Sequence, residues 1–230
     1  MIDNHTPPQP QQQRAKDTRA RIIRAAGRLF ETSGFEGASV NDIITAADTS
    51  KGAFYRHFPE GRVGVAKAIM DNTLVMDGVV PTNPKLQIIL DTGIILAHRI
   101  TSEPELRAAL RLSLHHNASN IYGTPWRAWI KINTAQLIDA QQHGEVLPNV
   151  IPEDQAYQIA GGWSGLVLTT EALDGDLTNL ELRVVRMYKN LMHVIATREA
   201  LMDLDFSVDR ACRLYGAFLA RQAAAEAETS

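Results

Sequence analysis

The chain has 230 residues, of which 45% are hydrophobic and only 6% aromatic, and its formal net charge is −3. This length allows a sizeable buried core, and the abundance of Ala, Leu and Ile favours packed helices over a sheet sandwich. No apolar run approaches the roughly 20 residues that cross a bilayer, and the polar N-terminus is unlike a signal peptide, so we expect a cytoplasmic protein.

The charge is distributed unevenly along the chain. Residues 14–70 hold ten Lys and Arg against six Asp and Glu, whereas residues 71–230 hold 13 basic and 19 acidic residues. A basic region joined to an acidic remainder can present one face to a polyanion while the rest repels it. This asymmetry favours a nucleic-acid-binding region near the N-terminus.

The first segments in chain order are a polar tail and a helix. Residues 1–13 are rich in Pro and Gln and lack apolar periodicity, which predicts a disordered tail. Between about Thr18 and Ser33, apolar side chains recur at i, i+4, i+7 and i+8, which predicts a helix. Gly34 then occupies a position where a left-handed residue ends a helix.

Two short helices follow, and their arrangement is informative. Ser39 and Asp42 have the spacing of a capping box, which predicts the start of a short helix. A break near Thr49 separates it from a second short helix, Ser50 to about Phe58. This is the layout of a helix-turn-helix, in which the second helix enters the major groove of DNA.

The second of these helices has an apolar face and a polar face. Phe54 and Phe58 are four residues apart and should point inward, whereas Lys51 and Tyr55 share another face and can point outward. Gly52 lacks a side chain, so the helix backbone can approach the groove closely. Neighbouring polar groups and the basic start of the first helix can reach phosphates. The residues that we expect to contact DNA are Lys16, Arg19, Ser39, Thr49, Ser50, Lys51, Gly52, Tyr55 and His57.

After residue 64 the helical segments are longer and prolines lie at or between them. The expected windows are 65–77, 85–102, 105–117, 125–143, 153–173, 179–199 and 208–225. The sequence contains no internal repeat and no strand-turn-strand pattern. The predicted fold is therefore all-α: three short helices, one connecting helix and a bundle.

The helix-turn-helix segment resembles the N-terminal signature of the TetR family of regulators. The resemblance covers roughly residues 16–70 and is carried by Gly34-Phe35, Ser39, Ile43 and the run Ser50–Phe58. It implies a homodimer that binds a pseudo-palindromic operator in double-stranded DNA and is released by a ligand. It also implies that Lys51, Gly52 and Tyr55 lie at bases or backbone, and that Ser39 and His57 lie at phosphates.

The same resemblance implies a domain division. It places a helix-turn-helix DNA-binding domain at residues 14–64 and a ligand-sensing and dimerisation domain at residues 65–230. The sequence departs from the family pattern after Phe58, where the turn is one residue longer and Arg62 is the nearest basic residue. A phosphate contact at the start of the fourth helix is therefore not carried over to this chain.

A second resemblance lies in the C-terminal region. Residues 104–112, and Trp129 placed ten residues before Asp139, are similar to the γ-butyrolactone receptor branch of actinomycete regulators. This branch implies control of antibiotic production or differentiation by a diffusible butyrolactone, butenolide or hydroxymethylfuran carboxylate. It also implies that Trp129 is the pocket tryptophan.

The spacing of polar and aromatic residues is compatible with a ligand pocket. Trp129, Asn133 and Gln136 share one helix face, so an aromatic plate and two amides can converge, and Trp163 can form another wall. Ordinary core packing is the alternative for both tryptophans. Three glycines in the 153–173 window indicate close packing, either at a dimer interface or around a ligand. The predicted ligand-binding residues are Leu90, Leu110, Trp129, Asn133, Gln136 and Trp163.

Enzymatic motifs are incomplete or missing. The segment Gly162–Gly165 resembles part of a nucleophile elbow, but Leu166 stands where the second glycine is needed and no strand precedes it. No His-Glu-x-x-His or glycine-rich phosphate loop is present, and Cys212 is the only cysteine. We expect no catalysis, cofactor or metal. A hydrolase is a remote alternative; a constitutive DNA-binding regulator and a pseudo-receptor that answers an antibiotic remain open.

Overall fold

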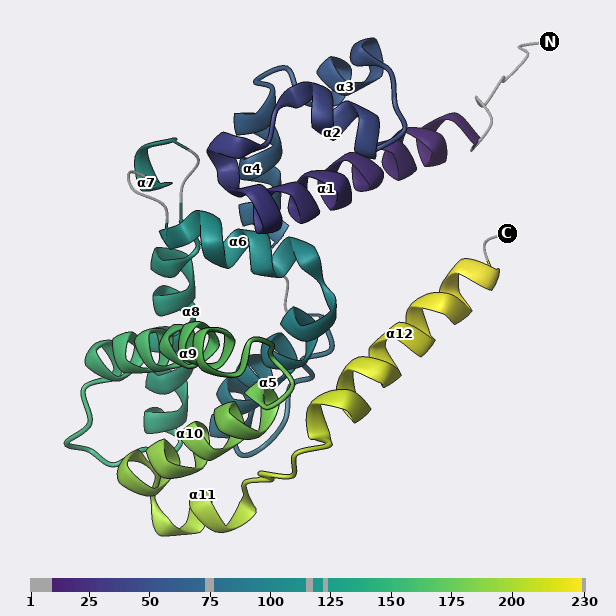
Figure 1. The fold of residues 1–230 in the computed structure, drawn as a ribbon. Helices are drawn as coiled ribbons and strands as arrows, with labels where there is room; N and C mark the ends of the chain where they lie inside the picture. Colours follow the sequence, from purple (N-terminus) through teal and green to yellow (C-terminus); the bar gives the residue numbers. More distant parts are fainter. Residues whose placement is uncertain (1–9, 73–76, 115–117, 122–123, 229–230) are drawn as a thin grey trace. The chain divides into compact units, whose positions relative to one another are not determined.

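A computed structural model describes residues 10–72, 77–114, 118–121 and 124–228 (Figure 1). Within these ranges the chain forms twelve helices and no strand, and an isolated β-bridge pairs Val146 with Ala196. The predicted all-α fold is confirmed. None of the helices in these ranges is both long enough and apolar enough to span a membrane.

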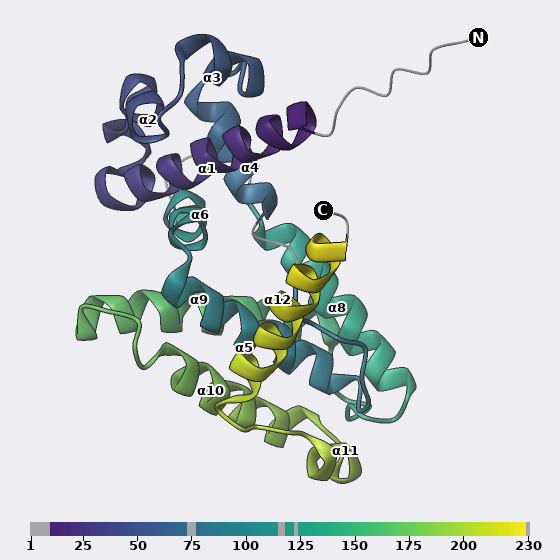
Figure 2. The ribbon, with the colours of Figure 1, turned by 90° about the vertical axis from the view of Figure 1, so that its right-hand side faces the viewer.

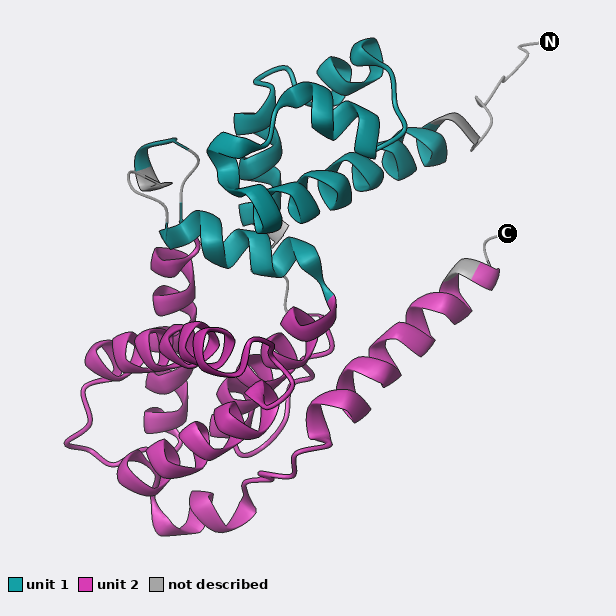
Figure 3. Cartoon of the chain, in the orientation of Figure 1, with its two compact units in different colours: residues 1–73, 103–124 teal, residues 74–102, 125–230 magenta. Residues whose placement is uncertain are grey.

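Contacts between residues divide the chain into two compact units, which are described separately (Figure 3). Unit 1 comprises Met1–Thr73 and Glu103–Thr124, and unit 2 comprises Leu74–Ser102 and Pro125–Ser230. The chain therefore passes between the units at three points.

Unit 1 contains the expected short helices and two further helices that share their core. Its helices are α1 (Pro10–Gly37), α2 (Val40–Ala46), α3 (Lys51–His57), α4 (Arg62–Asn72), α6 (Pro104–Leu114) and α7 (Ala118–Ile121). One hydrophobic cluster includes Ile22 of α1, Phe54 of α3, Ile69 of α4 and Leu112 of α6. The predicted domain boundary at residue 64 therefore differs from the division in the structure, because α4 and α6 pack with the N-terminal helices.

Helix α1 begins earlier than expected and bends at the expected glycine. It starts at Pro10, inside the segment predicted to be a disordered tail, so residues 10–13 are helical; residues 1–9 lie outside the described residues. The helix extends to Gly37, but Gly34 has φ 71° and interrupts the helical geometry. Glycine tolerates this positive φ because it has no Cβ.

Helices α1 and α6 approach each other closely (Figure 2). A Cβ at Gly27 would lie 3.1 Å from the Cα of Glu105, so the absence of a side chain at Gly27 allows this approach. Next to it, the Arg107 guanidinium donates to the Glu31 carboxylate at 2.6 Å, and Arg111 donates to the Glu31 carbonyl at 2.7 Å. These contacts explain why α6 belongs to unit 1, although the sequence placed it in the sensing domain.

Arg62, at the start of α4, has an internal structural role. Its guanidinium donates to the carbonyls of Phe35, Glu36 and Ala38 at 3.0–3.3 Å and to the Glu36 carboxylate at 2.8 Å. It also lies over the Phe35 ring, 4.6 Å from its centroid. Arg62 thus satisfies the carbonyls at the end of α1 and fixes α4 against them.

Unit 2 is a helical bundle with α5 at its centre. Its helices are α5 (Leu86–Ser102), α8 (Trp126–Gln142), α9 (Pro152–Asp174), α10 (Leu180–Ile195), α11 (Arg198–Asp203) and α12 (Arg210–Glu228). Helix α5 packs against α8, α10 and α12, and α9 packs against α8 and α10. Most of α5 is buried, as its nearly uninterrupted apolar sequence predicts. The window expected at 179–199 is divided in two, because Ala196 adopts an extended conformation after α10.

A buried ion pair attaches the start of α12 to α5. Asp91 is only 1% exposed, and the Arg210 guanidinium donates to its two oxygens at 2.6 and 2.8 Å. Gln87 donates to the same carboxylate at 2.7 Å, and Arg210 also donates to Asp205 at 2.9 Å. Paired and hydrogen-bonded in this way, the Asp91 charge is tolerated inside the bundle.

Candidate nucleic-acid interface and ligand site

The turn between α2 and α3 has the geometry predicted from the sequence. The Ser39 hydroxyl accepts from the Asp42 backbone N–H at 3.1 Å, and the Asp42 carboxylate accepts from the Ser39 N–H at 3.1 Å, which completes the capping box. Asp48 adopts φ 46°, the left-handed conformation that aspartate tolerates in turns. Ser50 then caps α3 by accepting from the Ala53 N–H at 3.1 Å. Local side-chain chemistry thus defines both helix starts.

Helix α3 presents the two faces that its sequence predicts. Phe54 and Phe58 are 0% and 3% exposed and lie in the core of unit 1. Lys51 is exposed and Tyr55 is 41% exposed, with the Tyr55 ring edge-on to Phe54 at a centroid distance of 5.3 Å. The Phe54 contact orients the tyrosine ring, which remains partly exposed to solvent.

The surroundings of Gly52 are open. A Cβ at this position would have no heavy atom within 4 Å, so packing within the chain does not require glycine here. Thr49 and His57 are half-buried, and Ser50 is exposed. The basic side chains predicted to reach phosphates, Lys16 and Arg19, are both exposed on α1. Arg19 also lies over the Phe58 ring, 5.3 Å from its centroid.

The Ser39 hydroxyl has a partner within the chain. It donates to the Asp42 carboxylate at 2.6 Å, and this bond, with the one from the Ser39 backbone, lowers the pKa of Asp42 below its ordinary value of 3.8. The phosphate contact predicted for Ser39 would have to compete with this bond. The spacing of Ser39 and Asp42 predicted the capping box correctly. It did not indicate that the Ser39 hydroxyl also donates a hydrogen bond to the Asp42 carboxylate.

In unit 2 the predicted aromatic residues form one group. Trp163 of α9 is edge-on to Trp129 of α8 at a centroid distance of 5.2 Å, and Trp126 stacks on Trp129 at 5.9 Å. Trp129 and Trp163 are 5% and 2% exposed. The Trp163 indole N–H donates to the carbonyl of Gly93 in α5 at 3.0 Å. The two tryptophans therefore meet at the junction of α5, α8 and α9.

The two predicted amides differ in their bonding. Asn133 is 1% exposed and donates to the Trp129 carbonyl at 2.9 Å, a bond within its own helix. Gln136 Oε1 is buried and has no hydrogen-bond partner in the structure. A buried polar atom without a partner is costly, so Gln136 is a candidate for contact with a molecule bound from outside.

The two predicted leucines lie in different units. Leu90 is fully buried in α5 of unit 2, on the helix that also carries Gly93. Leu110 is 6% exposed and lies in α6, which belongs to unit 1. The residues brought together within unit 2 are therefore those of α5, α8 and α9. Gly93, and Tyr188 of α10 packed against it, were not predicted; the one available signal is a glycine inside the apolar α5.

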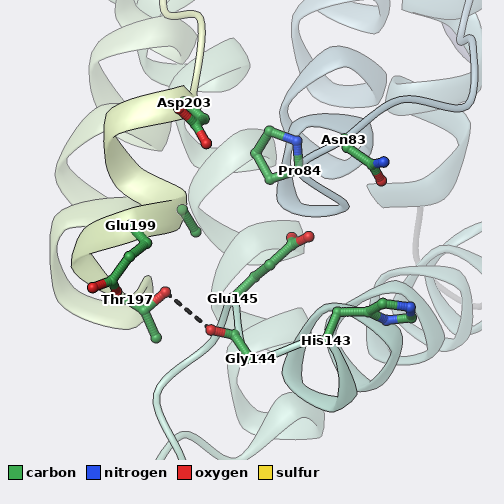
Figure 4. A pocket seen from close by; sticks show the side chains of 9 residues that line it. Asn83, Pro84, His143, Gly144, Glu145, Thr197, Glu199 and Asp203 are labelled. Carbon is green, nitrogen blue, oxygen red and sulfur yellow. Dashed lines mark hydrogen bonds between the residues drawn. The ribbon is translucent and has the colours of Figure 1, made fainter.

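A separate surface pocket of about 340 Å³ lies in unit 2 (Figure 4). Glu145, Glu199 and Asp203 contribute carboxylates to its lining, and Thr197 donates to the Gly144 carbonyl at 3.0 Å at its edge. None of the predicted ligand-binding residues lines it. Its acidic lining differs from the apolar surroundings that a lipophilic signal requires.

A capped helix-turn-helix with an exposed α3 face, in a chain that also carries a helical bundle, defines the class of helix-turn-helix regulators. The family described as "Bacterial regulatory proteins, tetR family" matches residues 22–69. The A-factor receptor protein of Streptomyces griseus is 31% identical over 186 residues, which span 80% of this chain and 66% of that protein. Residues 22–69 thus belong to the TetR family of bacterial regulatory proteins, and the chain is related to the A-factor receptor over most of its length.

Solved structures agree with this assignment. TylP, a TetR regulator from Streptomyces fradiae, is 28% identical with a TM-score of 0.82, over 89% of this chain and 99% of that one. CprB from Streptomyces coelicolor, a TetR family protein solved with its operator sequence, is 25% identical with a TM-score of 0.67, over 89% and 99%. The predicted resemblance to the TetR family and its γ-butyrolactone receptor branch is confirmed.

Proposed function

We propose that this chain is a ligand-responsive repressor that binds a pseudo-palindromic operator as a homodimer and releases it when a small diffusible signal binds. The exposed face of α3 carries the proposal for DNA. Lys51 and Tyr55 project from a helix whose other face is buried, and Gly52 leaves room for a close approach of the backbone. Thr49, Ser50 and His57, with Lys16 and Arg19 of α1, would supply further contacts, mainly to phosphates.

Homodimer formation is supported by an exposed apolar stripe on α9 and α10. Tyr157, Leu168 and Val194 are 60%, 37% and 70% exposed, although they lie in long helices of the bundle. Gly161 and Gly165 in α9 have no neighbouring atoms within 4 Å of a Cβ. Large exposed apolar side chains next to bare helix backbone suit close packing against a second copy. Light scattering of the wild type and of Leu168→Glu would test this: we expect a dimer for the former and a monomer for the latter.

The proposed signal is a γ-butyrolactone, butenolide or furan-type molecule, and the regulated genes would belong to secondary metabolism. The relationship to the A-factor receptor supports this class. The tryptophan pair supplies apolar walls, and Gln136 supplies a buried oxygen without a partner. A mostly apolar site with a few polar groups suits a lipophilic molecule with a polar ring.

Release would follow from a change in the separation of the two recognition helices. These helices must lie about 34–36 Å apart to enter successive major grooves, so a shift of a few Å would weaken both half-sites at once. A ligand that prefers the splayed state and an operator that prefers the closed state oppose each other reciprocally. The change would reach unit 1 through the three chain crossings, of which the one after α4 is nearest to α3 in sequence.

A gel-shift experiment on the upstream region of its own gene tests this function. Wild-type protein should retard the DNA, and the candidate compounds or culture extract should release it. If DNA is bound but never released, the constitutive alternative is correct; if an antibiotic alone releases it, the pseudo-receptor alternative is correct. Turnover of a lactone or ester by the purified protein would instead support a hydrolase.

A further inference from the structure

Tyr188 of α10 lies directly across Gly93 of α5. A Cβ placed at Gly93 would be 2.1 Å from the Tyr188 hydroxyl oxygen and 2.3 Å from its Cε2, so only glycine allows this packing. Tyr188 is 1% exposed. Since the Gly93 carbonyl also accepts the Trp163 indole, Tyr188 belongs to the same group of side chains as the tryptophan pair.

The Tyr188 hydroxyl makes no hydrogen bond with any described residue. Buried tyrosine hydroxyls usually find a partner, because leaving one unbonded costs free energy. The Trp163 N–H, by contrast, is bonded to Gly93. The hydroxyl therefore has no hydrogen-bond partner among the described residues, and Gln136 Oε1 is a buried oxygen of the same bundle that also lacks one.

We propose that the Tyr188 hydroxyl donates a hydrogen bond to the carbonyl oxygen of an uncharged lactone held among α5, α8, α9 and α10. This inference rests on the proposed function, and it names the chemical feature that the site recognises. Gln136 would bond to a second polar group of the same molecule.

Two observations favour an uncharged ligand over a carboxylate. Burial raises the pKa of Tyr188 well above its ordinary value, so the phenol remains protonated and neutral and can act as a donor. The polar groups of the tryptophan pair and of the α8 face that carries Trp129, from Trp163, Asn133 and Gln136, are an indole and two amides and carry no charge. A carboxylate buried here would lack a cation among these residues, and burying an unpaired charge is expensive.

Tyr188→Phe separates recognition from packing, because it removes only the hydroxyl and keeps the ring. The probe is a synthetic γ-butyrolactone with a hydroxymethyl group and an alkyl chain, and binding is measured by quenching of tryptophan fluorescence. We expect about tenfold weaker lactone binding, since a donor to the carbonyl is lost. Operator affinity in a gel shift should not change. Tyr215→Phe, which removes the same hydroxyl from a half-buried ring of α12, is the matched control and should bind the lactone like the wild type.

Thermal melting of the ligand-free proteins provides the second measurement. Removing an unpartnered buried hydroxyl should leave the melting temperature unchanged or raise it. Equal lactone affinity in Tyr188→Phe and wild type would overturn the inference and leave the proposed function intact. A lower melting temperature in Tyr188→Phe would overturn it as well, because the hydroxyl would then have a structural partner. Failure of the wild type to bind the lactone would overturn the proposed ligand class together with the inference.

Discussion

The two units place their candidate binding groups in opposite environments. In unit 1, Lys51 and Tyr55 project from a short helix into solvent, and the core beneath them is complete without them. In unit 2, Trp129, Trp163 and Tyr188 are buried and form part of the packing themselves. A surface that binds a large polyanion can change without loss of stability, whereas changes in the shape of an internal side chain also disturb packing, because these residues contact both ligand and core.

The largest effect is expected from Arg210→Met in unit 2. This change leaves Asp91, 1% exposed, as an unpaired buried charge, and breaking such a pair costs about 3–5 kcal/mol of the free energy of unfolding. Chemical denaturation measures it. The control is Arg213→Met, a half-exposed partner of Asp205 on the same helix, which should cost less than about 1 kcal/mol. Equal losses in the two variants would mean that the Asp91 pair is not buried in solution.

The matching change in unit 1 is Lys51→Ala. We expect operator affinity to fall about 5- to 150-fold, the loss typical of a side chain that contacts bases. The free energy of unfolding should change by less than about 0.5 kcal/mol, because Lys51 is exposed. Fluorescence anisotropy with labelled operator measures the first quantity and thermal melting the second. Lys131→Ala removes the same charge from the surface of α8 and serves as the control. A similar loss of operator affinity in Lys131→Ala would mean that the effect of Lys51→Ala arises from net charge and not from a contact with DNA.

This difference between the units also decides what the sequence could predict. Helix α3 was predictable because its determinants are local: Ser50 caps it, and Phe54 and Phe58 repeat at i, i+4 on the face that becomes buried. The same holds for Ser39 and Asp42, whose capping box depends only on a three-residue spacing. The TetR resemblance falls on these same local features.

The internal site was predictable only in part, because it depends on contacts between distant segments. Trp129 and Gln136 follow from one helix face, but the contact of Tyr188 with Gly93 joins α10 to α5 and leaves no local pattern. The assignment of α6 to unit 1 depends likewise on Gly27 meeting Glu105 and on the Glu31–Arg107 pair. Periodicity identifies which face of a helix is buried, but it does not identify the helix that covers it.

Gly52→Ala is expected to change function and stability in opposite directions. Alanine favours a helix by up to about 1 kcal/mol over glycine, and the space around Gly52 is open, so thermal stability should rise slightly. Operator affinity should fall several-fold, because the methyl group would separate α3 from the groove. The control is Gly216→Ala in α12, which also has open surroundings and should raise stability without affecting DNA binding. Unchanged operator affinity in Gly52→Ala would exclude the close backbone approach.

The smallest effect concerns the pH dependence of the capping box in unit 1. Because bonds from Ser39 lower the pKa of Asp42 below 3.8 in the folded state, the ionised carboxylate stabilises the fold above that value. This contribution is lost as the pH falls through the lowered pKa, where Asp42 becomes protonated. The denaturation midpoint of the wild type should therefore decline further between pH 5 and pH 2 than that of Asp42→Ala, by a small margin since the pair is exposed.

Asp71→Ala, which removes an exposed carboxylate of α4 that forms no hydrogen bond with the described residues, is the control and should follow the wild type. If Asp42→Ala and the wild type lose stability in parallel over this range, the Ser39–Asp42 bonds do not persist in solution, and the Ser39 hydroxyl would be free for the phosphate contact that the TetR resemblance implies.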